Sequence, residues 1–334
     1  MMDWSDRHCR YFFRQLAPHA VVYSEMLTTG ALIHGDVARH LDFDRAEHPV
    51  ALQLGGSEPA DLAHCAKLGE SWGYDEINLN CGCPSERVQR GAFGACLMAE
   101  PQLVADCVKA MQDAVTIPVT IKHRLGIDTI EDYDFVRHFV EILAAAGCRT
   151  FIVHARNAIL KGLSPKDNRQ VPALKYDYVY RLKREFHGCC IVINGGITSA
   201  AEITDHLQRV DGVMLGRSAY HNPYLLTQIE AGLDSTRTPA SRSEVATAMW
   251  RYADEQVQRG TQLRAITRHM LGLYHGQPNA RAWRRLLCDP ARLAENRADL
   301  ILEARQFVDD EAIEISAQTK RAASAPGRSH HEIT

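Results

Sequence analysis

The 334-residue sequence lacks an apolar run near the roughly 18 residues that a membrane-spanning helix needs. Its opening stretch, MMDWSDRHCR, is charged from the third residue and therefore does not look like a secretory signal. Charged residues make up 24% of the chain and apolar residues 46%, which is ordinary for a globular protein. We expect a cytoplasmic protein with one large domain and a smaller one.

Cysteine pairs with metal-binding spacing are also absent. Ten cysteines are spread along the chain, and the closest pairs are Cys81 with Cys83 and Cys189 with Cys190, so there is no CxxC. A structural zinc site usually shows two CxxC-like knuckles, or one with spaced histidines. We expect no metal site, and reduced thiols that are mostly buried as small apolar residues.

Positive charge is unevenly distributed in a chain whose net charge is −3. Between positions 259 and 292 there is one acidic residue, Asp289, against seven arginines: Arg259, Arg264, Arg268, Arg281, Arg284, Arg285 and Arg292. Such a surplus is typical of a phosphate-binding surface. It is equally typical of a solvated helix face whose ionic partners lie elsewhere in the fold. Composition alone favours neither interpretation.

Short β-branched or apolar runs alternate with helix-like stretches through the first two-thirds of the chain. The runs are Val21–Met26, Val50–Leu54, Glu76–Asn80, Pro118–Lys122, Thr150–His154, Cys190–Asn194 and Gly212–Gly216, and the helix-like stretches include 59–72, 101–114, 132–146, 177–186 and 199–208. This alternation predicts a parallel sheet with helices outside it. A doubly wound open sheet is the alternative, but it would usually place a GxGxxG turn after its first strand, and none occurs. We predict an α/β fold, a (β/α)8 TIM barrel. Because the helix-like Asp6–Leu16 comes before any strand, we expect the first barrel strand to be missing from this chain.

The pattern changes after the last of these runs. We assign residues 1–235 to the barrel and 236–316 to a small helical domain, which starts with the polar linker TRTPASRSE and takes Ser243 as a possible N-cap. The tail 317–334 is low in apolar residues and is expected to be disordered.

A TIM barrel places functional residues at the C-terminal ends of its strands and a phosphate site after the last two strands. Here those two strands end in Asn194-Gly195-Gly196 and in Gly216-Arg217, so backbone N–H groups can approach a phosphate closely and Arg217 adds charge. Polar residues end the other strands: Gln53, Asn78, Asn80, Lys122, Arg124, His154 and Arg156. Each alone is more often a satisfied structural residue. Together they outline a ligand with a carbonyl-rich ring and a phosphate, which fits flavin mononucleotide (FMN).

The loop NCGCPS at 80–85 places a thiol at the expected active mouth. Cys83 lies between Gly82 and Pro84, and no histidine in the local turn is available to activate it as a nucleophile. An ordinary cysteine thiol, with a pKa of about 8.5, is mostly protonated at neutral pH and suits a proton donor. The alternative is a packed cysteine in a tight turn.

These motifs closely resemble the tRNA-dihydrouridine synthases over nearly the whole chain, from Asp3 to about residue 315. The matching segments are DWSDR at 3–7, ALQLGG at 51–56, YDEINLNCGCPS at 74–85, GACLM at 94–98, PVTIKHR at 118–124, HAR at 154–156, GLSPKDNR at 162–169, INGGI at 193–197 and GVMLGR at 212–217. The run at 266–287 is similar to the subfamily that acts on uridines 20 and 20a of the D-loop.

The resemblance implies FMN as cofactor, NADPH as reductant, tRNA as partner, and reduction of the uracil C5–C6 double bond. FMN would contact Gln53, Lys122, His154, Asn194, Gly195, Gly196, Gly216 and Arg217. Cys83 would give the proton to C5, and Asn80 would lie against the flavin and the base. The residues expected to bind tRNA are Arg156, Lys166, Arg169, Arg281 and Arg284. Trp283 could stack on RNA, but its helical spacing favours the core. We expect a monomer.

One departure concerns the start of the chain. The family has a strand before the Asp3-Trp4 motif, ending in a Pro-Met pair whose backbone touches FMN, whereas this chain begins at Met1. We therefore expect a shortened form that folds or holds flavin poorly. Two other functions remain open: a barrel flavoenzyme that reduces a free pyrimidine, and a tRNA-binding module without catalysis. The first leaves the arginine-rich domain unexplained, and the second leaves unexplained why Cys83, Lys122 and His154 occur together.

Overall fold

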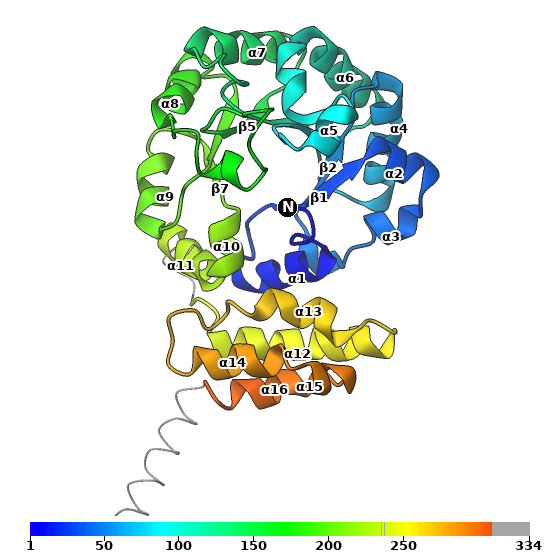
Figure 1. The fold of residues 1–334 in the computed structure, drawn as a ribbon, viewed down its shortest axis with the longest axis vertical. Helices are drawn as coiled ribbons and strands as arrows, with labels where there is room; N and C mark the ends of the chain where they lie inside the picture. Colours follow the sequence, from blue (N-terminus) through cyan, green and yellow to red (C-terminus); the bar gives the residue numbers. More distant parts are fainter. Residues whose placement is uncertain (235, 237, 309–334) are drawn as a thin grey trace, which may run out of the picture. The chain divides into compact units, whose positions relative to one another are not determined.

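A computed structural model describes residues 1–234, 236 and 238–308 (Figure 1). By contact, the chain divides into two compact units, Met1–Pro239 and Ala240–Thr334. The tail 317–334, predicted to be disordered, lies outside the described residues. The first unit contains seven strands: β1 Val22–Thr28, β2 Val50–Gly55, β3 Glu76–Cys81, β4 Val119–His123, β5 Thr150–His154, β6 Cys190–Asn194 and β7 Gly212–Met214.

The strands pair in strictly sequential order from β1 to β7, and every neighbouring pair is parallel. Figure 1 shows them inside a ring of helices. The predicted TIM-barrel-like fold with seven visible strands is therefore confirmed. The doubly wound alternative is wrong, because that fold needs a reversal in the strand order. Two predicted ends differ by two residues: β1 extends to Thr28, and β7 stops at Met214 instead of Gly216. The other strand ends agree with the prediction to within one residue.

Helices follow or precede the strands throughout this unit. They are α1 Arg7–Leu16, α2 Thr29–His34, α3 Val37–Leu41, α4 Pro59–Trp72, α5 Glu86–Arg90, α6 Pro101–Ala114, α7 Tyr133–Ala145, α8 Tyr176–Glu185, α9 Ala200–Leu207, α10 Arg217–His221 and α11 Tyr224–Leu233, with short 3-10 turns η1 Arg45–Glu47, η2 Gly94–Ala99 and η3 Asp167–Arg169. Asp6, predicted as the first helical residue, is the N-cap of α1, and its side chain accepts a hydrogen bond from the Cys9 N–H.

Successive residues of each strand face opposite sides of the sheet: one side packs into the hydrophobic core, and the other carries polar side chains. In β3, Ile77, Leu79 and Cys81 join the hydrophobic core, whereas Asn78 and Asn80 point to the opposite face. The same alternation in β4 places Ile121 in the core and Lys122 on the face that carries Asn80. A polar set of side chains therefore lines the inside of the strands and reaches their C-terminal ends.

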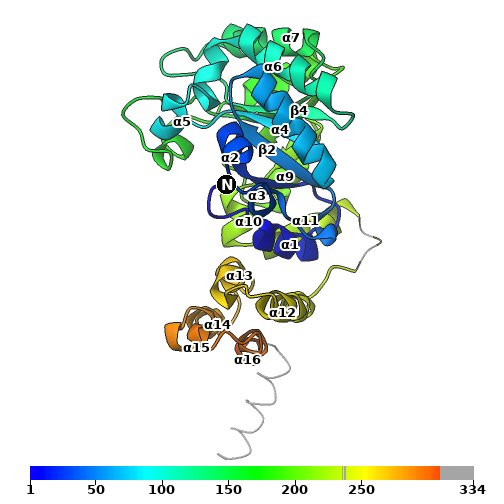
Figure 2. The same ribbon diagram turned by 90° about the vertical axis from the view of Figure 1, so that its right-hand side faces the viewer.

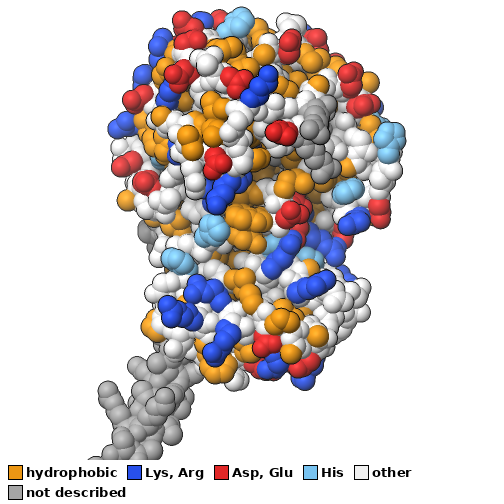
Figure 3. Space-filling view, viewed as in Figure 1, with side chains coloured by type: hydrophobic (Ala, Val, Ile, Leu, Met, Phe, Trp, Pro, Cys, Tyr) orange, Lys and Arg blue, Asp and Glu red, His pale blue; other side chains and the backbone are white. Residues whose placement is uncertain are grey.

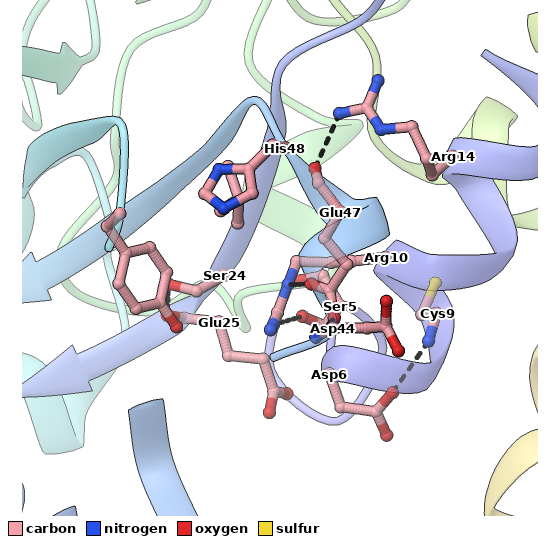
Figure 4. Close-up of polar contacts among 12 residues, drawn as sticks. Ser5, Asp6, Cys9, Arg10, Arg14, Ser24, Glu25, Asp44, Glu47 and His48 are labelled. Atoms are coloured by element: carbon pink, nitrogen blue, oxygen red, sulfur yellow. Dashed lines mark hydrogen bonds and ion pairs between the residues drawn. The ribbon is translucent and has the colours of Figure 1, made fainter. Parts of the chain in front are cut away.

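A buried ion pair fastens α1 to the loop before β2 (Figure 4). Arg10 Nε lies 2.5 Å from Glu47 Oε2, and the two side chains are 5% and 0% exposed. Arg14 Nη2 donates to the Glu47 carbonyl at 2.8 Å and to the Pro49 carbonyl at 3.0 Å. Two helical cations thus order the turn from which β2 starts.

The described part of the second unit is helical, with α12 Arg242–Gln258, α13 Leu263–Met270, α14 Ala280–Leu287, α15 Pro290–Ala294 and α16 Leu300–Arg305. Helix α16 packs against both α12 and α14 (Figure 2). The predicted N-cap Ser243 is wrong. Ser241 caps α12, because its hydroxyl accepts from the Glu244 N–H while the Glu244 carboxylate accepts from the Ser241 N–H. This S-x-x-E capping box was readable from the sequence.

Trp283 belongs to the core of the second unit, as its spacing predicted. Its side chain is 0% exposed, and Nε1 donates to the Met270 carbonyl at 3.0 Å. The cysteines are all free and six of the ten are buried, which confirms that most are buried. Within the described ranges, no helix is long and apolar enough to span a membrane. The same ranges contain no cluster of His, Cys, Asp or Glu arranged to hold a metal ion.

Candidate active site

Cations gather around His154 at the C-terminal ends of the strands. Burial lowers the pKa of His154 well below its ordinary value, and four cations add to this effect: Arg124, Lys122, Arg156 and Arg217. Arg169 belongs to the same cluster, because Arg217 also lowers its pKa after the larger effect of burial. Within the described residues, no carboxylate lies within ion-pair distance of any of these five cations. The site therefore carries a positive field that favours an anionic ligand.

Lys122 belongs to this cluster, and its side chain is half-buried. Its Nζ donates to Asn194 Oδ1 at 3.4 Å, and Asn194 Nδ2 donates to the Met214 carbonyl at 2.7 Å, which joins β4, β6 and β7. Burial lowers the pKa of Lys122 to about 8, and Arg124 acts in the same direction. An anion placed beside Lys122 would raise this pKa and favour the charged ammonium.

The two glycine turns bring backbone close to the same site. Gly195 and Gly196 have φ of +110° and +76°, and a Cβ on Gly195 would lie 2.4 Å from His154 Cδ2. A Cβ on Gly216 would meet only Met1 Sδ, at 3.5 Å, so the backbone there is open to a ligand. Gly216 directly precedes α10, as predicted for a turn that opens a helix. The Gly195-Gly196 turn does not, because α9 begins at Ala200 under the Ser199 cap.

Two buried guanidinium nitrogens at this site find no hydrogen-bond partner among the described residues: Arg156 Nε and Arg169 Nε. Backbone carbonyls surround these two arginines. Arg156 Nη1 donates to the carbonyls of Gln170 and Pro172, and Arg217 Nη2 donates to the Arg169 carbonyl at 3.0 Å. An unpaired buried N–H costs about 1–3 kcal/mol, more when charged. Unpaired donors beside open glycine backbone are the donor set that phosphate oxygens fit.

Gln53 and Asn80 form a polar edge on the neighbouring strands. Asn80 Nδ2 donates to Gln53 Oε1 at 2.9 Å, and Gln53 Nε2 donates to Asn78 Oδ1 at 2.8 Å. A side-chain amide has two N–H donors and two oxygen lone pairs, and Gln53 uses one of each in these contacts. Gln53 therefore keeps one N–H and one lone pair for the edge of a heterocyclic ring.

The Cys83 turn is held from both sides. Asn80 Oδ1 accepts the N–H groups of Gly82 and Cys83 at 3.0 Å each, and the Cys83 carbonyl accepts from the Ala95 N–H at 2.9 Å. Gly94 has φ +79°, and a Cβ there would lie 2.6 Å from the Cys83 carbonyl oxygen. The half-buried thiol faces Ser85 Oγ at 3.7 Å, and no described histidine bonds to it. This arrangement suits a proton donor, because a nucleophile would need a base.

Comparison with known proteins identifies the family of this chain. The model for the dihydrouridine synthase (Dus) family matches residues 1–310. The chain belongs to the dihydrouridine synthase family.

Curated dihydrouridine synthases resemble the whole chain closely. The tRNA-dihydrouridine(20/20a) synthase of Synechocystis sp. is 54% identical over 311 residues, which cover 92% of this chain and 93% of the relative. The protein of the same name from Xanthomonas campestris pv. campestris is 54% identical over 317 residues, 95% and 94% of the two chains. That from Escherichia coli K12 is 53% identical over 312 residues, 93% and 90%.

A solved structure, a 2-naphthoyl-CoA reductase complex, shares the fold at 11% identity and a TM-score of 0.50. The alignment covers 70% of this dihydrouridine synthase chain and 47% of the reductase chain, so it spans about half the length of that protein. At this identity the likeness shows the fold alone.

Two contacts of this dihydrouridine synthase went unrecognised in the sequence. Buried Arg124 donates to the Gly82 carbonyl at 3.2 Å, and to the carbonyls of Asn157 at 3.1 Å and Asn168 at 2.9 Å. Gln89 Nε2 donates to the Pro84 and Leu160 carbonyls, both at 2.8 Å. Both side chains join the Cys83 turn to the loop at 156–172. The sequence identified Arg124 only as a strand-end residue and contained no signal for Gln89.

The residues expected to bind RNA lie on two separate units. Lys166 is exposed on the 156–172 loop, while Arg281 and Arg284 are exposed on α14. Blue side chains, Lys and Arg, gather over the helical unit in Figure 3. Within the described residues, Arg281 and Arg284 have no ion pair, whereas Arg292 pairs with Glu295 and Glu303. The arginine-rich segment therefore contains both a solvated paired face and unpaired cations.

Proposed function

We propose that this dihydrouridine synthase is a tRNA-dihydrouridine(20/20a) synthase that binds FMN and uses NADPH to reduce the uracil C5–C6 bond. The observation that supports it most is the unpaired cation cluster beside the Cys83 turn, at the strand ends where a TIM barrel does its chemistry. Relatives at 52–54% identity bear this name. In this proposal residues 1–235 form the catalytic domain and 236–316 help to bind tRNA.

The site has the groups that FMN needs. Gln53, Lys122, His154 and Asn194 would hold its ring and side chain, and Gly195, Gly196, Gly216 and Arg217 would hold its phosphate. FMN held there and reduced by NADPH would supply the hydride for C6 of the uracil. His154, whose low pKa keeps it neutral, donates or accepts a hydrogen bond without adding charge.

Cys83 completes the reduction by giving the thiol proton to C5, so one hydride and one proton saturate the double bond. Asn80 keeps the turn in place through the N–H groups of Gly82 and Cys83. The uracil base can reach the thiol only after leaving the RNA stack. Arg156, Lys166 and Arg169 on the neighbouring loop are placed to hold the backbone of the displaced nucleotide.

Lys122 predicts a pH dependence of FMN binding. Below pH about 8 the ammonium is charged: it would donate hydrogen bonds to the flavin ring, and its charge would attract the FMN phosphate. Above that pH, binding must take up a proton. The affinity of the flavin-free protein for FMN should therefore fall as pH rises, approaching about tenfold per pH unit above 8. Fluorescence quenching of FMN between pH 7 and 9.5 measures this. Lys122→Met should bind FMN weakly, with an affinity that does not change with pH. Lys109→Met removes an exposed lysine of α6 and should keep the wild-type slope. A flat wild-type profile would contradict this role of Lys122.

Arg281 and Arg284 predict a salt dependence of tRNA binding. Replacing either with Gln should lower the slope of log affinity against log salt by about 0.7–1, since each phosphate contact releases counterions. Filter binding of tRNA at several KCl concentrations measures the slope. Arg184→Gln is the matched control, because Arg184 is also exposed, helical and without an ion pair within the described residues. Equal slopes in all proteins would remove Arg281 and Arg284 from the RNA surface.

The function itself is tested with FMN, NADPH and unmodified tRNA. With FMN supplied in excess, we expect purified protein to form dihydrouridine at positions 20 and 20a, detected by mass spectrometry of nuclease fragments. Free uridine and uracil serve as competing substrates and should not be reduced. Reduction of the free base without reduction of tRNA would favour a pyrimidine reductase, and tRNA binding without FMN binding would favour a non-catalytic module.

A further inference from the structure

A continuous ladder of side-chain hydrogen bonds runs inside the strands from the start of β3 to the Cys83 turn. Thr120 Oγ1 donates to Glu76 Oε1 at 2.6 Å and accepts from Asn78 Nδ2 at 2.8 Å. The ladder continues through Gln53 and Asn80 to the N–H groups of Gly82 and Cys83. Four side chains thus connect a carboxylate remote from the strand ends to the turn of the proposed proton donor.

The direction of every bond in this ladder is set by its two ends. At the Cys83 end, backbone N–H groups can only donate, so Asn80 must turn its oxygen toward them and its NH2 toward Gln53. At the other end, the Glu76 carboxylate accepts a hydrogen bond from the Thr120 hydroxyl, which leaves a Thr120 lone pair to accept from the Asn78 NH2. Because both ends agree, the amides of Asn78 and Gln53 have a single satisfied orientation.

Reversing any amide in the ladder would place two NH2 groups or two carbonyl oxygens against each other. The cost is high because Asn78 and Thr120 are 0% and 2% exposed, so water cannot repair the mismatch. Burial raises the pKa of Glu76, and the hydroxyls of Thr120 and Tyr23 act against this rise. Tyr23 donates to the same Glu76 oxygen at 2.9 Å but takes no part in the ladder.

We propose that Glu76, acting through Thr120, is a positioning residue of the active site. It reinforces, from the far end of the ladder, the orientation in which Asn80 accepts both N–H groups of the Cys83 turn and Gln53 offers its remaining N–H and lone pair to a ligand. The turn is therefore ordered from inside the strands as well as from the loops above it. The catalytic meaning of this ordering rests on the proposed function, whereas the ordering itself does not.

The test removes one hydroxyl and keeps the volume. Thr120→Val cuts the connection between Glu76 and Asn78, and the Thr120 position no longer specifies which way the amides face. Thr120→Ser restores the hydroxyl. Tyr23→Phe is the matched control, because it takes a buried hydroxyl from the same Glu76 oxygen and leaves the ladder whole.

The first readout needs neither FMN nor tRNA. Iodoacetamide alkylation of Cys83 is followed by peptide mass spectrometry, with exposed Cys288 in the same molecule as reference. We expect the Cys83 to Cys288 rate ratio to change by about threefold to tenfold in Thr120→Val, the effect of one buried hydrogen bond on an equilibrium. Thr120→Ser and Tyr23→Phe should stay near the wild-type ratio.

The second readout is steady-state kinetics with tRNA. Thr120→Val should lower kcat while KM for tRNA stays constant, and Thr120→Ser should recover kcat. An unchanged alkylation ratio in Thr120→Val, or an equal change in Tyr23→Phe, would overturn the proposal. If every variant and the wild type fail to reduce tRNA, the proposed function fails, and the alkylation ratios still decide whether the ladder orders the turn.

Discussion

Replacing Cys83 with Ala should abolish dihydrouridine formation while the protein keeps its yellow flavin and its affinity for tRNA. Turnover is expected to fall by about 10²–10⁴-fold, the usual contribution of a positioned general acid. The thiol is not needed to hold the fold, because the turn is fixed by the backbone groups of Gly82 and Cys83 bonded to Asn80. Turnover is measured as dihydrouridine formed per flavin, and binding by filter retention of tRNA.

Cys96→Ala is the control for this prediction. Cys96 is also a half-buried free cysteine in the segment after the Cys83 turn, and its thiol donates a hydrogen bond to the Phe93 carbonyl at 3.1 Å. It should keep near wild-type turnover. Undiminished turnover in Cys83→Ala would remove Cys83 from the chemistry, and loss of flavin in that variant would show that the thiol shapes the site instead of supplying the proton.

Replacing Glu47 with Gln should be the most destabilising of the substitutions considered. The amide has the same shape, but it leaves the Arg10 guanidinium buried without its counter-charge (Figure 4). Breaking a buried ion pair from one side costs about 3–5 kcal/mol of unfolding free energy. Urea denaturation followed by circular dichroism measures this loss. Because the other Glu47 oxygen accepts from the Asp44 N–H at 2.9 Å, the single amide oxygen of the variant can keep only one of these two contacts.

Helix α1 itself provides the matched control. Arg7 and Asp42 also form an ion pair between this helix and the segment before β2, but their side chains are 36% and 49% exposed. Asp42→Asn should change the unfolding free energy by less than about 1 kcal/mol, as exposed pairs do. A similar loss of unfolding free energy in both variants would mean that burial does not determine how much these two ion pairs stabilise the fold.

The strands and their order could be predicted from the sequence because each is a short apolar run followed by a helical stretch. Thr150–His154 and Cys190–Asn194 have the predicted bounds. Strand-end residues were recognisable because parallel strands all end at the same edge, so Lys122, His154 and Gly195 had to lie close together. Periodicity also placed Trp283 in the core, because a large apolar residue at helical spacing faces the neighbouring helices.

Other features depend on contacts that no local pattern encodes. Gln89 meets the Leu160 carbonyl across 71 positions, and Arg124 meets the Asn168 carbonyl across 44, so the link between the two loops appears only after folding. The ladder from Glu76 to Asn80 joins side chains of three strands, so it exists only after the strands have paired. Which group donates in each of its hydrogen bonds depends on the groups at its two ends. The apolar run at 212–216 predicted a longer last strand than the structure has. Strand β7 ends at Met214, and Gly216 is already the N-cap of α10.

A single-turnover measurement tests most directly whether the cation cluster and the Cys83 turn are two sides of one reductive site. Protein loaded with FMN is reduced with one equivalent of NADPH under argon and mixed with unmodified tRNA. We predict that flavin absorbance returns with tRNA and that about one dihydrouridine appears per flavin reoxidised, as one hydride and one proton require. Absorbance that stays bleached with tRNA, or returns without any dihydrouridine, would contradict the shared site.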